Sequence, residues 1–141
     1  MRFIGERSRL APDIQDMMNG LEDRTAGNDK LNLVIALNYG GRAEIAAAAQ
    51  RLAAEAAAGR DPETIDEAAF DAALQTAGVP DPDLLIRTSG EQRISNFLLW
   101  QCAYSEFVFV DELWPDFTPE VFARALGAYQ SRERRFGAVA G

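Results

Sequence analysis

A short stretch in the second half of the chain contains the residue types that bind phosphate groups. In the sequence IRTSGEQRIS, Arg87 and Arg93 flank a Thr-Ser-Gly turn and Ser95 follows closely. The forked donors of arginine match the oxygens of a phosphate, and a serine hydroxyl adds one more donor. The spacing therefore predicts a phosphate or diphosphate site. The alternative is that both arginines form salt bridges with carboxylates such as Glu91, and the pattern alone leaves that open.

Strands and helices alternate along the whole chain. Apolar runs bounded by turn residues predict strands over 2–5, 31–37, 84–87 and 107–110. Helical spacing, capping residues and helix-favouring composition predict helices over 12–26, 43–59, 66–76, 96–103 and 119 to about 134. Repeated β-α-β order implies an α/β fold with a largely parallel sheet and helices on both faces. Without linkers or repeats, residues 1–141 are predicted to form a single domain.

This arrangement would bring the candidate phosphate-binding residues together. Ligands of parallel α/β sheets bind at the carboxyl ends of the strands, and Arg87 ends the predicted strand over 84–87. Ser95 would cap the predicted helix over 96–103, and a helix N-terminus favours anions. We therefore expect two guanidinium groups, a hydroxyl and a helix N-terminus to converge.

Composition excludes several classes of protein. The net charge of -8 argues against a nucleic-acid binder, which needs a broad cationic surface. The chain has no histidine, so it cannot form a Ser-His-Asp triad or a histidine-ligated zinc site. A metal would have to be a hard cation such as Mg²⁺, held largely through a ligand's phosphates.

The N-terminal residues and the cysteine content bear on the cellular compartment. The first ten residues are too charged for a signal peptide, and no apolar run reaches about 18 residues. Cys102 is the only cysteine and lies in an apolar segment, where it is expected to be a small buried side chain. We therefore expect a cytoplasmic protein.

A second group of arginines closes the chain. Arg132, Arg134 and Arg135 lie in the sequence RERRFG. Such a cluster in an acidic protein suits a small anion. The alternative is a solvated helix end whose arginines offset the helix dipole.

Four motifs together resemble one known family. The stretch IRTSGEQRISNFLLWQCAYSEF, with NYGGR, LWPDF and RERRFG, closely resembles the C-terminal part of bacterial undecaprenyl diphosphate synthases, which are cis-prenyltransferases. The similarity runs from RFIGERSRL to RRFG and covers essentially the whole chain. The fold expected from it is a cis-prenyltransferase fold lacking its N-terminal part.

The resemblance implies specific site residues. Family members bind the diphosphate of isopentenyl diphosphate through the positions of Arg87, Arg93, Ile94 and Ser95. The position of Glu106 helps to hold Mg²⁺ on that diphosphate. The positions of Arg135 and Gly137, in an arginine-any-glycine motif, reach across a homodimer to complete the partner's site.

The resemblance also implies a reaction and its participants. Isopentenyl diphosphate is condensed head to tail onto an allylic diphosphate such as farnesyl diphosphate, with cis double bonds, to make the undecaprenyl diphosphate lipid carrier precursor. The product grows in an apolar tunnel, for which Leu31 and Leu33 are candidate lining residues. Ordinary core packing is the alternative for both leucines. Peripheral membrane contact would allow the product to be released.

The chain also departs from the family pattern. The family's N-terminal motifs, which supply the metal-binding aspartate, the catalytic asparagine motif and the allylic diphosphate site, are absent from the 141 residues. No catalytic residue is therefore expected in this chain, and we expect it to be inactive alone. Gln92 replaces a histidine found in some relatives.

Two alternatives to a catalytic chain remain open. The first is a non-catalytic partner subunit of a cis-prenyltransferase, although it would not need Arg87, Arg93, Ser95 and Glu106. The second is an unrelated phosphate-binding α/β domain. Product length and oligomeric state do not follow from the sequence.

Overall fold

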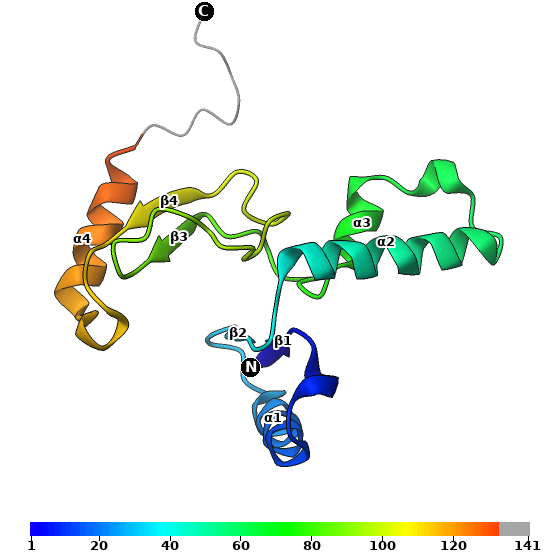
Figure 1. Cartoon of the computed structure of the whole chain (residues 1–141), viewed down its shortest axis with the longest axis horizontal. Coiled ribbons are helices and arrows are strands. Elements are labelled where there is room, and N and C mark those ends of the chain that lie inside the picture. The colour runs from blue at the N-terminus through cyan, green and yellow to red at the C-terminus, as the bar shows by residue number, and fades with distance from the viewer. Residues whose placement is uncertain (133–141) are drawn as a thin grey trace, which may run out of the picture. The chain divides into compact units, whose positions relative to one another are not determined.

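The computed structural model describes residues 1–132, which fall into two compact units (Figure 1). Unit 1 is Met1–Val79 and unit 2 begins at Pro80. Each unit contains one pair of parallel strands together with one or more helices. The single domain over 1–141 stays a prediction.

Unit 1 is built on the pair β1 (Arg2–Ile4) and β2 (Val34–Ala36). The strands run parallel with Arg2 opposite Val34, and α1 (Pro12–Thr25) connects them. Flanking bonds from Arg2 N to Leu33 O (2.8 Å) and from Leu37 N to Ile4 O (2.9 Å) close the ladder at both ends. The predicted strand over 31–37 is therefore too long, because a three-residue partner strand can pair no more of it.

The rest of unit 1 is a helical pair. Helix α2 (Gly41–Ala57) packs against α3 (Glu67–Ala73), and Ala48 and Leu52 are buried. The buried carboxylate of Glu44 accepts a hydrogen bond from the backbone N–H of Gln75 (2.8 Å). Helix α3 ends earlier than predicted because Leu74 adopts an extended conformation.

Unit 2 contains the second strand pair. Strands β3 (Leu84–Arg87) and β4 (Glu106–Phe109) are parallel, with Leu84 opposite Glu106 and Arg87 opposite Phe109. Helix α4 (Pro119–Gln130) packs on β4 and begins at Pro119, where the Thr118 side chain caps it. The core of this unit consists of four buried residues and three partly buried ones: Val108, Val110, Val121, Ala125, Leu84, Ile86 and Phe117.

The predicted helix over 96–103 is wrong. Ser95, Asn96 and Leu98 have φ values of 46°, 65° and 44°, which lie in the left-handed region that a right-handed α-helix cannot contain. Isolated turns replace it, for example through the bond from Phe97 N to Ile94 O (3.0 Å). Cys102 in this segment is buried, as predicted. Within this irregular segment Gln101 and Cys102 are buried, whereas Phe97 is exposed.

The fold class is confirmed: this is an α/β protein whose paired strands are all parallel within the described residues. The strands form two separate two-stranded sheets, one in each unit. Among the helices over 1–132, none is long and apolar enough to cross a membrane.

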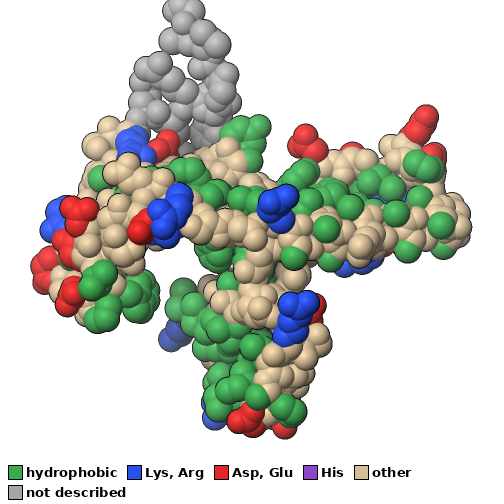
Figure 2. All heavy atoms as spheres, viewed as in Figure 1, with side chains coloured by type: hydrophobic (Ala, Val, Ile, Leu, Met, Phe, Trp, Pro, Cys, Tyr) green, Lys and Arg blue, Asp and Glu red, His purple; other side chains and the backbone are tan. Residues whose placement is uncertain are grey.

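An exposed apolar patch lies at the beginning of α4. Figure 2 shows hydrophobic side chains gathered at this end of unit 2, at the lower left of the view. Leu113, Trp114 and Phe122 are all exposed, and the ring of Trp114 stacks on Phe117 with centroids 5.7 Å apart. Within α4 itself, the buried residues are Val121 and Ala125.

Two glycines of unit 1 give a matched test of the backbone. Gly5 has a φ of 114°, and a Cβ there would lie 1.9 Å from the carbonyl oxygen of Leu37. Gly20 lies within α1 with open space around it. We expect Gly5→Ala to lower the free energy of unfolding by roughly 2 kcal/mol or more. Gly20→Ala should raise it by about 0.5–1 kcal/mol. Urea unfolding followed by circular dichroism tests both, and a neutral Gly5→Ala would contradict the structure.

Glu22 should make unit 1 sensitive to acid. The Arg7 guanidinium donates to its carboxylate (2.6 Å), as does the backbone N–H of Phe3 (2.8 Å), and these bonds hold the pKa of Glu22 below its ordinary value of 4.5. A lowered folded-state pKa stabilises the fold above the unfolded pKa, and this contribution disappears as the pH falls through the folded value. Glu22→Gln should therefore cost about 1–2 kcal/mol at neutral pH and almost nothing in strong acid.

Exchange of the Phe3 amide hydrogen, measured at neutral and acidic pH, reports this contact directly. The exposed Glu63 offers a control, since Glu63→Gln should leave the Phe3 protection unchanged. An equal loss of protection by Glu22→Gln at both pH values would refute the assignment.

Candidate functional site

The candidate phosphate site lies at the carboxyl end of β3. There the Nη1 group of Arg87 donates to Ser95 Oγ (2.9 Å) and to the backbone carbonyl of Arg93. These two bonds fold the segment 88–96 back onto the end of the strand. The structure thus brings together Arg87, Ser95 and the backbone of Arg93, which is only part of the convergence that the sequence predicted.

The first turn of this segment is anchored to the chain that follows β4. Ser89 N donates to Glu112 O (2.8 Å) and Gly90 N donates to Val110 O (2.9 Å). Ser89 and Gly90 both have positive φ, and a Cβ at Gly90 would lie 3.3 Å from Asp111 Oδ1. The segment is therefore fixed at one end by backbone bonds and at the other by Arg87.

Arg93 points its side chain elsewhere. Its guanidinium forms an ion pair with Glu91, so the salt-bridge alternative is what the structure shows for this arginine. The Arg93 side chain is 63% exposed, and exposed ion pairs contribute only about 0–1 kcal/mol. A phosphate with several charged oxygens can compete for such a guanidinium.

Ser95 is exposed but is not a helix cap. Its φ of 46° and the turns that follow remove the helix N-terminus from the predicted site. Because Ser95 Oγ accepts a hydrogen bond from Arg87, its own O–H remains available as a donor. Ile94 is half-buried, and its carbonyl accepts the bond from Phe97 N (3.0 Å). The anion-binding chemistry therefore rests on guanidinium groups and a hydroxyl.

Glu106 lies away from these residues. The strand register places it opposite Leu84, three residues before the position opposite Arg87, which is roughly 10 Å along the strand. Side chains alternate between the faces of a sheet, so Glu106 shares a face with Val108 and Arg87 lies on the other face. Within the described residues, Arg87 and Glu106 do not form one site.

Glu106 instead pairs with the end of the last helix. Arg132 Nη1 donates to Glu106 Oε2 (2.7 Å) and to the carbonyl oxygen of Phe107 (2.9 Å). Sequence reasoning noted Arg132 only as part of a basic cluster and missed this contact. The two residues are 26 positions apart, so no local pattern could have shown it.

The donor set can be compared with what Mg²⁺ requires. Residues 1–132 contain no group of three or more histidine, cysteine, aspartate or glutamate side chains that could hold a metal ion. Mg²⁺ is commonly bound by one or two carboxylates together with phosphate oxygens and water. Glu106 Oε2 bonds Arg132, while Oε1 has no recorded partner in the described part of the chain. Glu106 therefore fits as a single carboxylate ligand, but not as a complete metal site.

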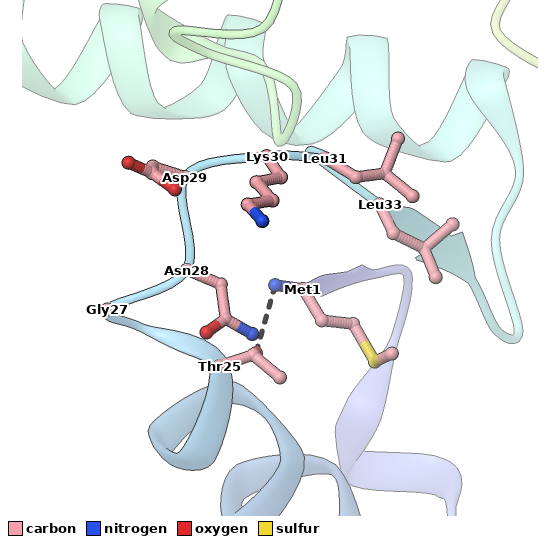
Figure 3. Close-up of a pocket in the computed structure, with 8 residues that line it drawn as sticks. All are labelled: Met1, Thr25, Gly27, Asn28, Asp29, Lys30, Leu31 and Leu33. Carbon is pink, nitrogen blue, oxygen red and sulfur yellow. Dashed lines mark hydrogen bonds between the residues drawn. The ribbon is translucent and has the colours of Figure 1, made fainter.

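The two candidate tunnel leucines lie together in unit 1. A pocket of about 510 Å³ is lined by Met1, by Thr25 at the end of α1 and by residues of the segment between α1 and β2, shown in Figure 3: Gly27, Asn28, Asp29, Lys30, Leu31 and Leu33. Leu31 is 74% exposed and Leu33 is 43% exposed, so neither is an ordinary core residue. Their role in a product tunnel stays a prediction.

The last predicted site residues cannot be placed. Arg135 and Gly137 lie outside the described residues. Arg132 lies just before them and is the one arginine of that cluster whose contacts are known.

Taken together, the fold and these side chains define an α/β protein with a candidate anion-binding arrangement at the carboxyl end of a parallel strand. Residues 1–137 match the family model described as "Putative undecaprenyl diphosphate synthase". The chain belongs to this family, and the resemblance seen in its motifs is confirmed.

Individual relatives support the same family assignment. The chain is 54% identical over 140 residues to an isoprenyl transferase of Rhizobium meliloti. It is also 54% identical over 138 residues to the ditrans,polycis-undecaprenyl-diphosphate synthase ((2E,6E)-farnesyl-diphosphate specific) of Xanthomonas axonopodis pv. citri. These matches cover 99% and 97% of this chain, but only 57% and 54% of the relatives.

A solved structure shows the same relationship. Lavandulyl diphosphate synthase from Lavandula x intermedia, in complex with dimethylallyl diphosphate, superposes with a TM-score of 0.94 at 42% identity. The superposition covers 97% of this chain and 59% of that one. The chain therefore spans little more than half the length of the proteins it matches.

Proposed function

We propose that this chain carries the isopentenyl diphosphate half-site of a cis-prenyltransferase that makes undecaprenyl diphosphate. The observation that carries the proposal is the pair of bonds that holds Ser95 and the Arg93 backbone against Arg87. Membership of the synthase family supports the same reading. Arg87, Arg93, Ile94 and Ser95 would surround the diphosphate.

The geometry suits a diphosphate because the anchoring bonds leave donors unused. Both recorded bonds of Arg87 come from Nη1, which leaves the N–H groups of Nη2 and Nε for a phosphate. Ser95 can donate its hydroxyl, and Arg93 can exchange the exposed Glu91 for a more highly charged anion. The site would thus be preorganised at Arg87 and adaptable at Arg93.

The proposed reaction forms one carbon–carbon bond. The carbon–oxygen bond of the allylic diphosphate, such as farnesyl diphosphate, breaks and the diphosphate leaves with the electron pair. The double bond of isopentenyl diphosphate attacks the allylic carbon, and loss of a proton gives the new cis double bond. This chain's residues would hold and orient isopentenyl diphosphate, while Mg²⁺, when bound, would offset diphosphate charge. No residue of this chain is assigned the proton transfer.

Other parts of the proposal concern the assembly. We place the enzyme in the cytoplasm as a homodimer in which Arg135 and Gly137 complete the partner's site, with peripheral membrane contact for product release. Leu31 and Leu33 would line the path of the growing chain. By itself the chain should form no polyprenyl product even with Mg²⁺, and product from pure material would contradict this.

A non-catalytic partner subunit is the second candidate. The feature that favours it is the arginine-any-glycine motif of Arg135 and Gly137 in the sequence, which such a subunit would donate to its catalytic partner. Such a subunit should bind a full-length synthase in a pull-down, whereas the half-site reading does not require that interaction.

Calorimetric titration with isopentenyl diphosphate, with and without Mg²⁺, tests the half-site. Arg93→Ala and Ser95→Ala should each weaken binding about tenfold or more, since hydrogen bonds to charged groups are worth about 1.5–3 kcal/mol. Arg124→Ala is the matched control, because Arg124 is an exposed arginine of unit 2 that is paired with Glu112. Equal affinity of Arg93→Ala and the unaltered chain, or no binding by folded protein, would contradict the proposal.

A further inference from the structure

Glu91 and Arg93 lie in the candidate phosphate site, between two points at which the backbone is anchored. Before them, Gly90 N donates to Val110 O (2.9 Å). After them, the carbonyl oxygen of Arg93 accepts a hydrogen bond from the Arg87 guanidinium. Both side chains therefore project from anchored backbone, and their ion pair is built into this turn of the chain.

Arg93 reaches the site through its backbone, while its side chain turns to Glu91. The Cα of Arg93 is joined through the carbonyl carbon to the oxygen that Arg87 holds, so it lies close to the Arg87 guanidinium. From there, a long arginine side chain can extend to an anion bound by the other donors of Arg87. In the structure the Arg93 guanidinium pairs with Glu91 instead. The Glu91 carboxylate is therefore what occupies this guanidinium when no anion is bound.

The ion pair is weak enough to be exchanged for a better anion. The side chains of Arg93 and Glu91 are 63% and 37% exposed, and exposed pairs are worth little in water. Phosphate groups form charge-assisted and often bidentate bonds with a guanidinium, and a diphosphate carries more charge than a carboxylate. Displacement of Glu91 is therefore favourable, but part of the binding free energy is lost because the existing pair must break first.

We propose that Glu91 is a built-in competitor for the anion site: its carboxylate holds the Arg93 guanidinium until a diphosphate displaces it, and this competition limits the affinity of the site. The inference rests on the proposed function, in which Arg93 binds the diphosphate of isopentenyl diphosphate. A growing product needs a fresh isopentenyl diphosphate for each addition, so the site must exchange its anion repeatedly. A resident carboxylate that takes back the guanidinium favours this exchange.

A purely structural role for the ion pair predicts a change of the opposite sign. If Glu91 served only to stiffen the segment 88–96, its removal would loosen the segment, place Arg87 and Ser95 less well and weaken anion binding. If Glu91 competes with the anion, its removal frees the Arg93 guanidinium and strengthens binding. The direction of the change in affinity therefore distinguishes the two roles.

Calorimetric titration of the full chain with inorganic pyrophosphate measures this direction. Glu91→Gln should lower the dissociation constant about two- to fivefold, which corresponds to the loss of one exposed ion pair. Removal of any nearby carboxylate also reduces repulsion of the anion, so Glu91→Gln is measured again in the Arg93→Ala background. There it should have almost no effect, because no guanidinium is left to release. Glu112→Gln is the matched control, since the Arg124–Glu112 pair is similarly exposed, at 64% and 29%, and its loss should leave the affinity unchanged.

The outcomes separate this inference from the proposed function. No saturable binding of pyrophosphate by the folded, unaltered chain would overturn the half-site, and the role of Glu91 with it. Binding that Arg93→Ala weakens, but that Glu91→Gln leaves equal or weakens, would overturn the competitor role alone. Equal tightening by Glu91→Gln with and without Arg93 would also overturn it. If Arg93→Ala binds too weakly to titrate, the sign of the change in Glu91→Gln decides against the Glu112→Gln control. Thermal unfolding of the Glu91 variant should be nearly unchanged, because the pair is exposed.

Discussion

The parallel register of β3 and β4 is the constraint on which the candidate sites of unit 2 depend. Leu84 lies opposite Glu106, and Ile86 lies opposite Val108. A shift of one residue would turn Val108 away from α4 and expose it, because alternate side chains lie on opposite faces. Burial of Val108 with Val121 and Ala125 therefore fixes the register. Once the register is fixed, so are the ends and faces on which Arg87 and Glu106 lie.

Because of this register, unit 2 has two separate polar clusters. At the carboxyl end of β3, Arg87 holds the Ser95 hydroxyl and leaves donors for an anion. At the beginning of β4, Arg132 holds one oxygen of Glu106. The first cluster presents donors that suit an anion, whereas the second is an ion pair between a guanidinium and a carboxylate. In both, an arginine with a backbone carbonyl partner orients a more mobile side chain, so rigidity comes from the backbone and chemistry from the side chains.

Much of the fold of unit 2 and the position of Arg87 could be predicted from the sequence. The boundaries of β3 follow from a short apolar run and the start of α4 from its Thr-Pro pair, because local patterns determine them. The end of α4 at Gln130 lies earlier than the predicted end near residue 134. The place of Arg87 at the carboxyl end of β3 follows from the general rule for parallel sheets. Family membership was recognisable because four long motifs occur together.

The other features of the fold and of the candidate sites depend on contacts between distant residues, which no local pattern encodes. Residues 96–103 have helical composition, yet Ser95, Asn96 and Leu98 adopt positive φ, so tertiary packing overrides propensity there. Residues 31–33 looked like strand, but β1 offers too short a partner. The separation of Glu106 from Arg87 depends on register, and the bond to Arg132 joins residues 26 positions apart.

The central claim is that the Arg87 cluster binds the diphosphate of isopentenyl diphosphate. The most direct measurement follows the side-chain Nε–H resonances of the arginines by NMR during titration with isopentenyl diphosphate. Binding at this cluster should give saturable shifts at Arg87 and Arg93, with Arg51 and Arg60 of unit 1 unchanged. Shifts confined to unit 1, or no shift at Arg87 in folded protein, would contradict it.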